Sequence, residues 1–229
     1  LPRFSVDMDF SLLNPNTGFS FVPYIKAIHR ELDSLGLKVT IETKKRRHGS
    51  QIESAFIKAE TIQNLIYLEV PQEITGALHR NARLKVRLEI DILPPPYARY
   101  KVESLLLPIP FLVKLFSPSC LFSGKLHALL CRQWKSRIKG RDYFDFLWFI
   151  GKNIPCDLKH LKARMVQTGH LEQNETLNRN LLIKLLHEKI ECIDLQKAKH
   201  DVEPFVNDVH ALDLWTPDLF HQTIDKISV

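Results

Sequence analysis

The spacing of hydrophobic residues changes near residue 119, and this change limits the fold more than any other feature of the sequence. Before it, apolar and charged residues alternate in "LKVRLEID" (84–91), as in a half-buried strand. Three prolines follow and end the strand, because proline cannot donate to a strand ladder. After residue 119 the spacing becomes helical, through segments 119–134, 140–152, 157–168, 176–192, 194–207 and 216–227.

The first half also contains shorter candidate elements. Residues 3–10 and 37–42 alternate like strands, residues 20–35 have helical spacing, and 55–60 and 65–70 are weaker candidates. Strands mixed with helices, followed by a helical half, favour an α+β or α/β fold. We expect an α/β core over residues 1–118 and a helical domain over residues 119–229.

Composition narrows the functional classes. Hydrophobic residues make up 45% of the 229, enough for a packed core, and the net charge of +6 is a mild bias toward polyanionic partners. Four cysteines without CxxC spacing predict free thiols in a reducing cytoplasm. No apolar run approaches the ~20 residues of a membrane helix, so we expect a cytoplasmic protein without membrane contact.

Two aspartates in "RFSVDMDF" (3–10) present an electrostatic problem. Alternation places Asp7 and Asp9 on one strand face, where Asp is disfavoured and the two charges repel. Asp91 ends another strand, with Glu89 on the same face, and pairing of the two strands would gather three or four carboxylates at one sheet edge. A divalent cation such as Mg²⁺ would compensate them. The alternative interpretation is that Asp9 caps a turn and Asp91 ends a strand.

A second group of charges lies in "GKLHALLCRQWKSRIKGRDYFDF". Lys125 and Arg132 are seven residues apart, which predicts a shared helix face, and such cations can bind triphosphate oxygens. Asp142 would orient one of these cations or accept a proton. The alternative is a solvated helix face with ion pairs at three- and four-residue spacing. His127 is interpreted as a packing or surface residue, and Cys131 as a buried small apolar residue.

The three segments "RFSVDMDF", "VRLEIDILPPP" and "LFSGKLHALLCRQWKSRIKGRDYFDFLWFI" together resemble the AbiEii/AbiGii-type toxin nucleotidyltransferases. These are the toxin components of type IV toxin–antitoxin and abortive-infection systems. The resemblance implies a polymerase β-like nucleotidyltransferase fold and transfer of a nucleoside monophosphate from an NTP. The implied acceptor is RNA, in particular tRNA, and the implied protein partner is an antitoxin.

The resemblance also implies roles for individual residues. Asp7 and Asp9 would hold Mg²⁺ or Mn²⁺, and Asp91 would be the third carboxylate, beside the acceptor hydroxyl. Lys125 would contact the nucleotide phosphates, and Asp142 would be a further essential residue. Five further motif residues would have supporting roles. Ser5, Arg132 and Arg141 would contact the nucleotide. Arg3 and Asp145 would support the site without an assigned contact.

One feature of the family is missing from the sequence. Family members carry a Gly-Gly-Thr or Gly-Ser turn before the R-x-S-x-D-h-D motif, and its backbone N–H groups bind the triphosphate. This chain begins two residues before Arg3. We therefore expect weakened nucleotide binding and an exposed apolar patch that favours self-association or partner contact.

Two other functional classes remain open. A metal-dependent nuclease would use Glu42 and Lys44 of "IETK", but Asp91 is followed by isoleucine and prolines rather than by a lysine motif. A non-catalytic remnant would bind RNA or an antitoxin. The basic run "KKRRH" (44–48) is compatible with RNA contact and equally with a solvated loop.

Overall fold

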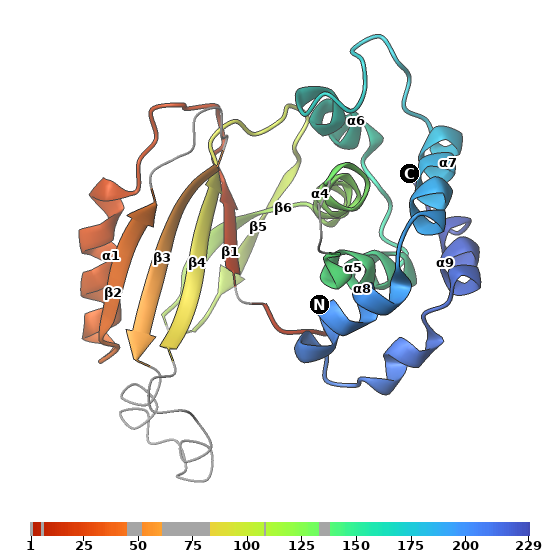
Figure 1. Cartoon of the computed structure of the whole chain (residues 1–229). Coiled ribbons are helices and arrows are strands. Elements are labelled where there is room, and N and C mark those ends of the chain that lie inside the picture. Colours follow the sequence, from red (N-terminus) through yellow and green to blue (C-terminus); the bar gives the residue numbers. More distant parts are fainter. Residues whose placement is uncertain (1, 6, 45–51, 61–82, 108, 133–137) are drawn as a thin grey trace. The chain divides into compact units, whose positions relative to one another are not determined.

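The computed structural model describes residues 2–5, 7–44, 52–60, 83–107, 109–132 and 138–229, which form two compact units (Figure 1). The sheet unit is Ser5–Pro94. The helical unit combines Leu1–Phe4 with Pro95–Val229. The units thus divide at 94/95, whereas the change of sequence pattern suggested 118/119. The R-x-S-x-D-h-D motif is divided between them, with Arg3 in one unit and the rest in the other.

In the residues that the structure describes, the sheet unit is a four-stranded mixed sheet with one helix. Its strands lie in the order β1-β4-β3-β2, with β1 parallel to β4 and the other pairs antiparallel. The elements are β1 (Asp7–Ser11), α1 (Val22–Ser34), β2 (Val39–Lys44), β3 (Ile52–Glu60) and β4 (Arg83–Asp91).

Alternation along β4 explains which face of this sheet is covered. Leu88 is buried with Phe21 and Ala55, and Ile28 of α1 packs against this cluster, as expected for the apolar face of the strand. Met8 and Phe10 of the edge strand β1 belong to the same face but remain 52% and 53% exposed. The apolar face is therefore only partly covered by α1.

From Pro95 on, the helical unit continues with a two-stranded hairpin. The hairpin packs with the helices, so the boundary between the units lies before the hairpin and not after it. The backbone N–H of Ser117 donates to the carbonyl of Arg99, and the Arg99 guanidinium lies 2.9 Å from the Asp157 carboxylate. The elements are β5 (Tyr100–Leu105), β6 (Phe111–Phe116), α4 (Pro118–Cys131), α5 (Gly140–Gly151), α6 (Leu158–Gln167), α7 (Arg179–Glu191), α8 (Leu195–Val202), two 3₁₀ turns (Glu203–Phe205 and His210–Leu214) and α9 (Pro217–Ile224).

Side-chain caps explain where most of these helices begin. The side chains at five N-cap positions accept a hydrogen bond from the backbone N–H three residues on, which satisfies a donor that the helix cannot pair itself. These residues are Ser117, Asp157, Asn178, Asp194 and Thr216. Behind them the helices share one core, in which the rings of Phe122 and Phe149 stack 5.0 Å apart.

The first residues of the chain join this unit through backbone contacts. Arg3 forms a β-bridge with Val206, and the Phe4 N–H donates to the Phe205 carbonyl at 2.8 Å. None of the helices in the described part of the chain is long and apolar enough to cross a membrane. All four cysteines are free thiols, as predicted.

Two helices end earlier than their spacing suggests. The helix predicted to 134 ends at Cys131, because Arg132 adopts extended backbone angles (φ −72°, ψ 122°). The prediction that Lys125 and Arg132 share a helix face is therefore wrong. The helix predicted to 207 ends at Val202 and continues as a 3₁₀ turn at Pro204. The candidate element 65–70 lies outside the described residues.

Candidate active site

The carboxylates of β1 and β4 lie on the face of the sheet opposite α1. Residues paired across neighbouring strands point to the same side, and so do residues two apart on one strand. In the register of β1 and β4, Asp7 lies opposite Arg87, Asp9 opposite Glu89, and Ser11 opposite Asp91. This face, here called the carboxylate face, therefore carries Asp7, Asp9, Ser11, Arg87, Glu89 and Asp91.

Arg87 supplies the positive charge between the two strands. Its Nε lies 3.5 Å from Oδ1 of Asp7, and its Nη1 donates to Oε1 of Glu89 at 3.1 Å. The hydrogen bond to Glu89 raises the pKa of Arg87, and the charges of Glu89, Asp7 and Asp9 raise it further, against partial burial. A guanidinium thus balances the carboxylates that the sequence suggested for a metal ion.

Asp91 and Glu89 occupy different environments. Asp91 is only 6% exposed, and its Oδ1 accepts the backbone N–H of Leu93 at 3.0 Å, as a carboxylate does when it ends a strand. Glu89 lies directly opposite Asp9, roughly 5 Å away across the sheet, whereas Asp91 is diagonal to Asp9 at roughly 8 Å. Glu89 is thus the nearer acidic partner of Asp9.

The donor set of the carboxylate face fits a hard divalent cation, because Asp7, Asp9 and Glu89 offer only carboxylate oxygens. Their oxygens do not form a group of three within 4.8 Å of one another, in the part of the chain that the structure describes. Arg87 occupies the position between them. Binding of an ion here would therefore require Arg87 to move away and the carboxylates to come together.

In the helical unit, Asp145 of the "GRDYFDF" segment is fully buried on α5. Arg3 binds it at two points, with Nε 2.5 Å from Oδ1 and Nη2 2.6 Å from Oδ2. Lys125 of α4 adds a third contact, with Nζ 2.8 Å from Oδ2. A buried carboxylate needs such compensation, and the two cations provide it.

Asp142 lies one helical turn before Asp145 and faces a different group of cations. It is buried, and the nearest atoms of Arg132 and Lys139 are each 3.9 Å from its carboxylate. Burial lowers the pKa of Lys139, while the charge of Asp142 opposes this shift. Beside Asp142 is a pocket of about 300 Å³ with a basic rim, lined in part by Arg132, Lys139, Lys189 and Tyr143.

Arg141, which follows Gly140 and precedes Asp142, has an unusual environment. Its guanidinium lies 4.3 Å from the centre of the Phe205 ring, a cation–π contact. Its Nε is buried and finds no hydrogen-bond partner in the described residues. A buried donor without an acceptor costs free energy. The Nε–H of Arg141 is therefore available to donate to an additional acceptor, such as a phosphate oxygen.

The other predicted residues have simpler surroundings. Ser5 is exposed, and its hydroxyl donates to the Asp7 carbonyl at 3.3 Å. Glu42 is ion-paired with Lys58 at 2.5 Å and lies on β2, with β3 and β4 between it and β1. Of the basic run 44–48, residues 45–48 lie outside the described residues.

Sequence reasoning counted Glu89 only as a possible fourth carboxylate beside Asp91, and it assigned no role to Arg87. The missing information was the register, because alternation gives a residue's face but not the residue opposite it.

A family model described as the nucleotidyl transferase AbiEii toxin of type IV toxin–antitoxin systems matches residues 1–222 of the 229. Comparison with individual curated proteins gave no match. The family match confirms the resemblance seen in the three motifs, and the mixed sheet followed by a helical half agrees with the expected nucleotidyltransferase fold. The chain belongs to the AbiEii family of nucleotidyltransferase toxins.

Proposed function

We propose that this chain transfers a nucleoside monophosphate from an NTP to RNA, with tRNA as the first acceptor to test, in the cytoplasm where both reactants occur. The observation that supports this most is the carboxylate face, where Asp7, Asp9 and Glu89 lie on two adjacent strands. The chain's membership of a nucleotidyltransferase family gives this face its meaning. In the reaction, an acceptor hydroxyl attacks the α-phosphorus and its proton passes to a carboxylate. The bond from that phosphorus to the β-phosphate oxygen breaks and pyrophosphate leaves.

Asp7 and Asp9 are the proposed ligands of Mg²⁺ or Mn²⁺. When bound, such an ion neutralises phosphate charge and lowers the pKa of an oxygen nucleophile. The third carboxylate accepts the proton of the acceptor hydroxyl. The family resemblance assigns this role to Asp91, whereas the register favours Glu89, because Glu89 lies opposite Asp9 and Asp91 is occupied at a turn.

The helical unit supplies the proposed phosphate contacts. Arg141 has a buried donor without an acceptor in the described residues, and Arg132 borders the basic pocket beside Asp142. Asp142 orients Arg132 and Lys139 in this proposal. Lys125 already binds the buried Asp145, so it would contact a phosphate with its remaining N–H groups.

Incubation with labelled NTPs, Mg²⁺ and total RNA tests the proposal. Label in RNA supports transfer, whereas shortened RNA indicates a nuclease and no change in the RNA indicates a non-catalytic binding protein. The double variant Asp7→Asn/Asp9→Asn should abolish incorporation. The matched control is Arg30→Ala, which changes an exposed residue of α1 in the same unit and should retain incorporation.

Two further variants decide the third carboxylate. If Glu89 accepts the proton, Glu89→Gln loses incorporation while Asp91→Asn keeps most of it. Loss of incorporation in Asp91→Asn, with incorporation kept in Glu89→Gln, would instead identify Asp91 as the proton acceptor. Folding of both variants is checked by circular dichroism, because Asp91 is buried. Asp91→Asn is expected to fold, since the amide oxygen of the new side chain can still accept the Leu93 N–H.

Membership of the family also implies an antitoxin partner. We propose self-association or antitoxin binding at the uncovered apolar edge of the sheet unit, where Met8 and Phe10 are exposed. Solution scattering of the isolated chain over a concentration series tests self-association, and monomers at every concentration would contradict it.

A further inference from the structure

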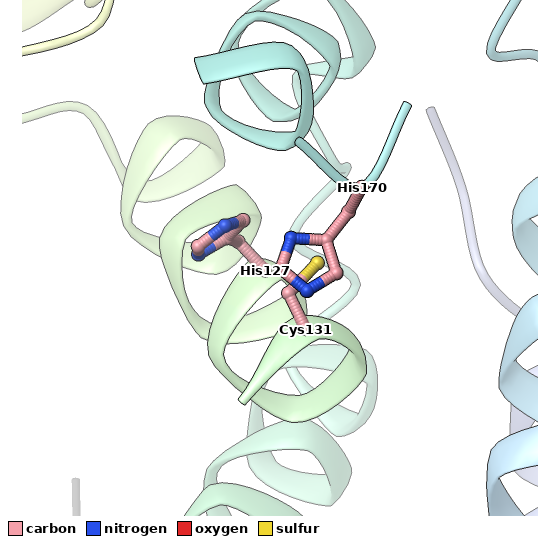
Figure 2. Close-up of side chains that lie close together, drawn as sticks. All are labelled: His127, Cys131 and His170. Atoms are coloured by element: carbon pink, nitrogen blue, oxygen red, sulfur yellow. The ribbon is translucent and has the colours of Figure 1, made fainter. Parts of the chain in front are cut away.

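Three potential metal ligands lie together in the helical unit, on residues to which the proposed reaction assigns no role. His127 and Cys131 are four residues apart on α4, so they share one face of the helix, and His170 follows the end of α6 (Figure 2). One ligand atom from each of the three lies within 4.8 Å of the other two. Within the described residues this is the only such group.

The backbone at the end of α6 brings His170 to this position. Gly169 adopts a left-handed conformation (φ 72°), which ends the helix and turns the chain back. The His170 N–H then donates to the Met165 carbonyl at 2.9 Å, and the Gly169 N–H to that of Val166 at 3.0 Å. The rings of His127 and His170 meet edge to face, with centroids 6.3 Å apart.

Thr168 holds both imidazoles through a single hydroxyl group. Its Oγ1 lies 2.9 Å from Nε2 of His127 and 2.9 Å from Nδ1 of His170. The hydroxyl proton is directed to backbone carbonyls, those of Arg164 at 3.0 Å and Met165 at 3.2 Å. With the hydroxyl proton on a carbonyl, the oxygen accepts from the N–H tautomer of each ring, which leaves a lone pair on the other nitrogen of each neutral imidazole.

We propose that His127, Cys131 and His170 bind a Zn²⁺ ion, with Thr168 as the outer residue that fixes both histidines. Imidazole nitrogen and thiolate sulfur are the donors that Zn²⁺ prefers, and three protein ligands leave a fourth position for water. Ligating histidines usually donate their second ring N–H to an oxygen acceptor, which is the role of Thr168 here. The ion would join α4 to the segment after α6.

Burial affects two of the proposed ligands in opposite directions. It lowers the pKa of His127 to about 3. Burial also raises the pKa of the Cys131 thiol to about 11, so binding must release the thiol proton. Arg164 and Arg132 place positive charge near His127, and the Cys131 thiolate formed on binding offsets part of it.

The geometry needs at most a small movement on binding. Zinc bonds of about 2.0–2.3 Å place neighbouring ligand atoms roughly 3.3–3.8 Å apart, and the three ligand atoms already lie within 4.8 Å of one another. His127 and Cys131 are fixed by the helix, whereas His170 is exposed and has room to move. His170 is therefore the residue expected to close the site.

Titration of the full chain with Co²⁺, after removal of bound metal with a chelator, tests the site. Co²⁺ replaces Zn²⁺ in such sites and reports a thiolate ligand through a charge-transfer band in the near ultraviolet. We expect this band to saturate at one ion per chain and to disappear when Zn²⁺ is added. Absence of the band would overturn the proposal.

Matched variants identify the ligands. His170→Ala should weaken Co²⁺ binding at least tenfold, and Cys131→Ser should remove the band. His200→Ala changes an exposed histidine elsewhere, and Cys192→Ser changes the exposed cysteine that lines the same pocket as Cys131 and His170; both should bind as the wild type does. A band that survives in Cys131→Ser, or disappears in Cys192→Ser, would show that the thiol ligand has been assigned incorrectly.

Two measurements separate the site from general effects on folding. His170 is exposed, so His170→Ala should retain the circular dichroism spectrum of the wild type, and unchanged affinity in this folded variant would contradict the proposal. Thr168→Val keeps the shape but loses the hydroxyl, and should weaken binding by roughly 10- to 100-fold. Wild-type affinity in Thr168→Val would remove Thr168 from the site.

Discussion

Arg3 and Asp145, 142 positions apart in the sequence, form a two-point ion pair within the helical unit. The Arg3 side chain is 6% exposed and that of Asp145 is fully buried, so both charges have lost their water. The first arginine of the R-x-S-x-D-h-D motif therefore has a structural partner in the R-D-x-x-D segment. This contact attaches the chain's first residues to α5.

Arg3→Ala should lower the free energy of unfolding of the helical unit by about 3 kcal/mol, because it leaves Asp145 buried with only Lys125 as compensation. Urea denaturation followed by tryptophan fluorescence measures this, since all three tryptophans fall in this unit. The control is Arg30→Ala, whose exposed pair with Glu31 should matter by less than about 1 kcal/mol. Equal effects of the two variants would contradict the prediction.

Gly140 permits a close approach between α5 and α8. A Cβ atom at this position would lie 1.9 Å from the Ala198 carbonyl oxygen, so Gly140→Ala must push the helices apart. We expect a loss of about 1–3 kcal/mol in the free energy of unfolding. The matched control is Gly124→Ala in α4, where no atom lies within 4 Å and the change should stabilise the helix by up to about 1 kcal/mol. A neutral Gly140→Ala would contradict the close packing.

Much of the fold could be predicted because local patterns were unambiguous. The strand ending at Asp91 and the helix containing Asp142 and Asp145 both lie close to the bounds that their periodicity predicts. The end of the helix at Cys131 could not be predicted, because neither glycine nor proline follows Cys131 to signal it.

The contacts of the charged residues could not be predicted in the same way. Periodicity places Asp142 and Asp145 on one helix face, but Arg3 and Lys125 reach only Asp145, because distant parts of the chain decide the partners. The role of Arg87 likewise depends on the register between strands separated by more than 70 residues. Such pairings follow from tertiary packing, which no local pattern specifies.

Arg87 should compete with metal ions for the carboxylate face. Arg87→Gln removes the charge that now balances Asp7 and Glu89, so Mn²⁺ should bind this variant more tightly, by up to roughly fivefold. The rise in melting temperature on adding Mn²⁺ measures the effect. Lys85→Gln is the control, because Lys85 is on the same strand but lies over the Phe56 ring. The double variant Asp7→Asn/Asp9→Asn should show no metal-dependent rise.

A decrease in Mn²⁺ affinity in Arg87→Gln would contradict competition and would show that Arg87 instead holds the carboxylates in a metal-binding arrangement. A metal-dependent rise equal in the wild type and in Asp7→Asn/Asp9→Asn would show that the ion binds elsewhere in the chain.

His127 should make the stability of the helical unit depend on pH. Burial, with smaller contributions from Arg164 and His170, lowers its pKa from 6.5 to about 3 in the folded chain. Between these values the unfolded chain binds a proton that the folded chain does not. The free energy of unfolding should therefore decrease as the pH falls below about 6.5, by up to about 1.4 kcal/mol per pH unit from this group.

Urea denaturation at pH 7 and pH 5, in chelator so that no metal occupies His127, measures this dependence in the wild type and in His127→Gln. The range stops at pH 5 because most carboxylates titrate below it. His127→Gln should lose less stability than the wild type between the two pH values, whereas the control His200→Gln, at an exposed position, should behave as the wild type does. Equal pH dependence in His127→Gln and the wild type would show that His127 takes up a proton as readily in the folded chain as in the unfolded one.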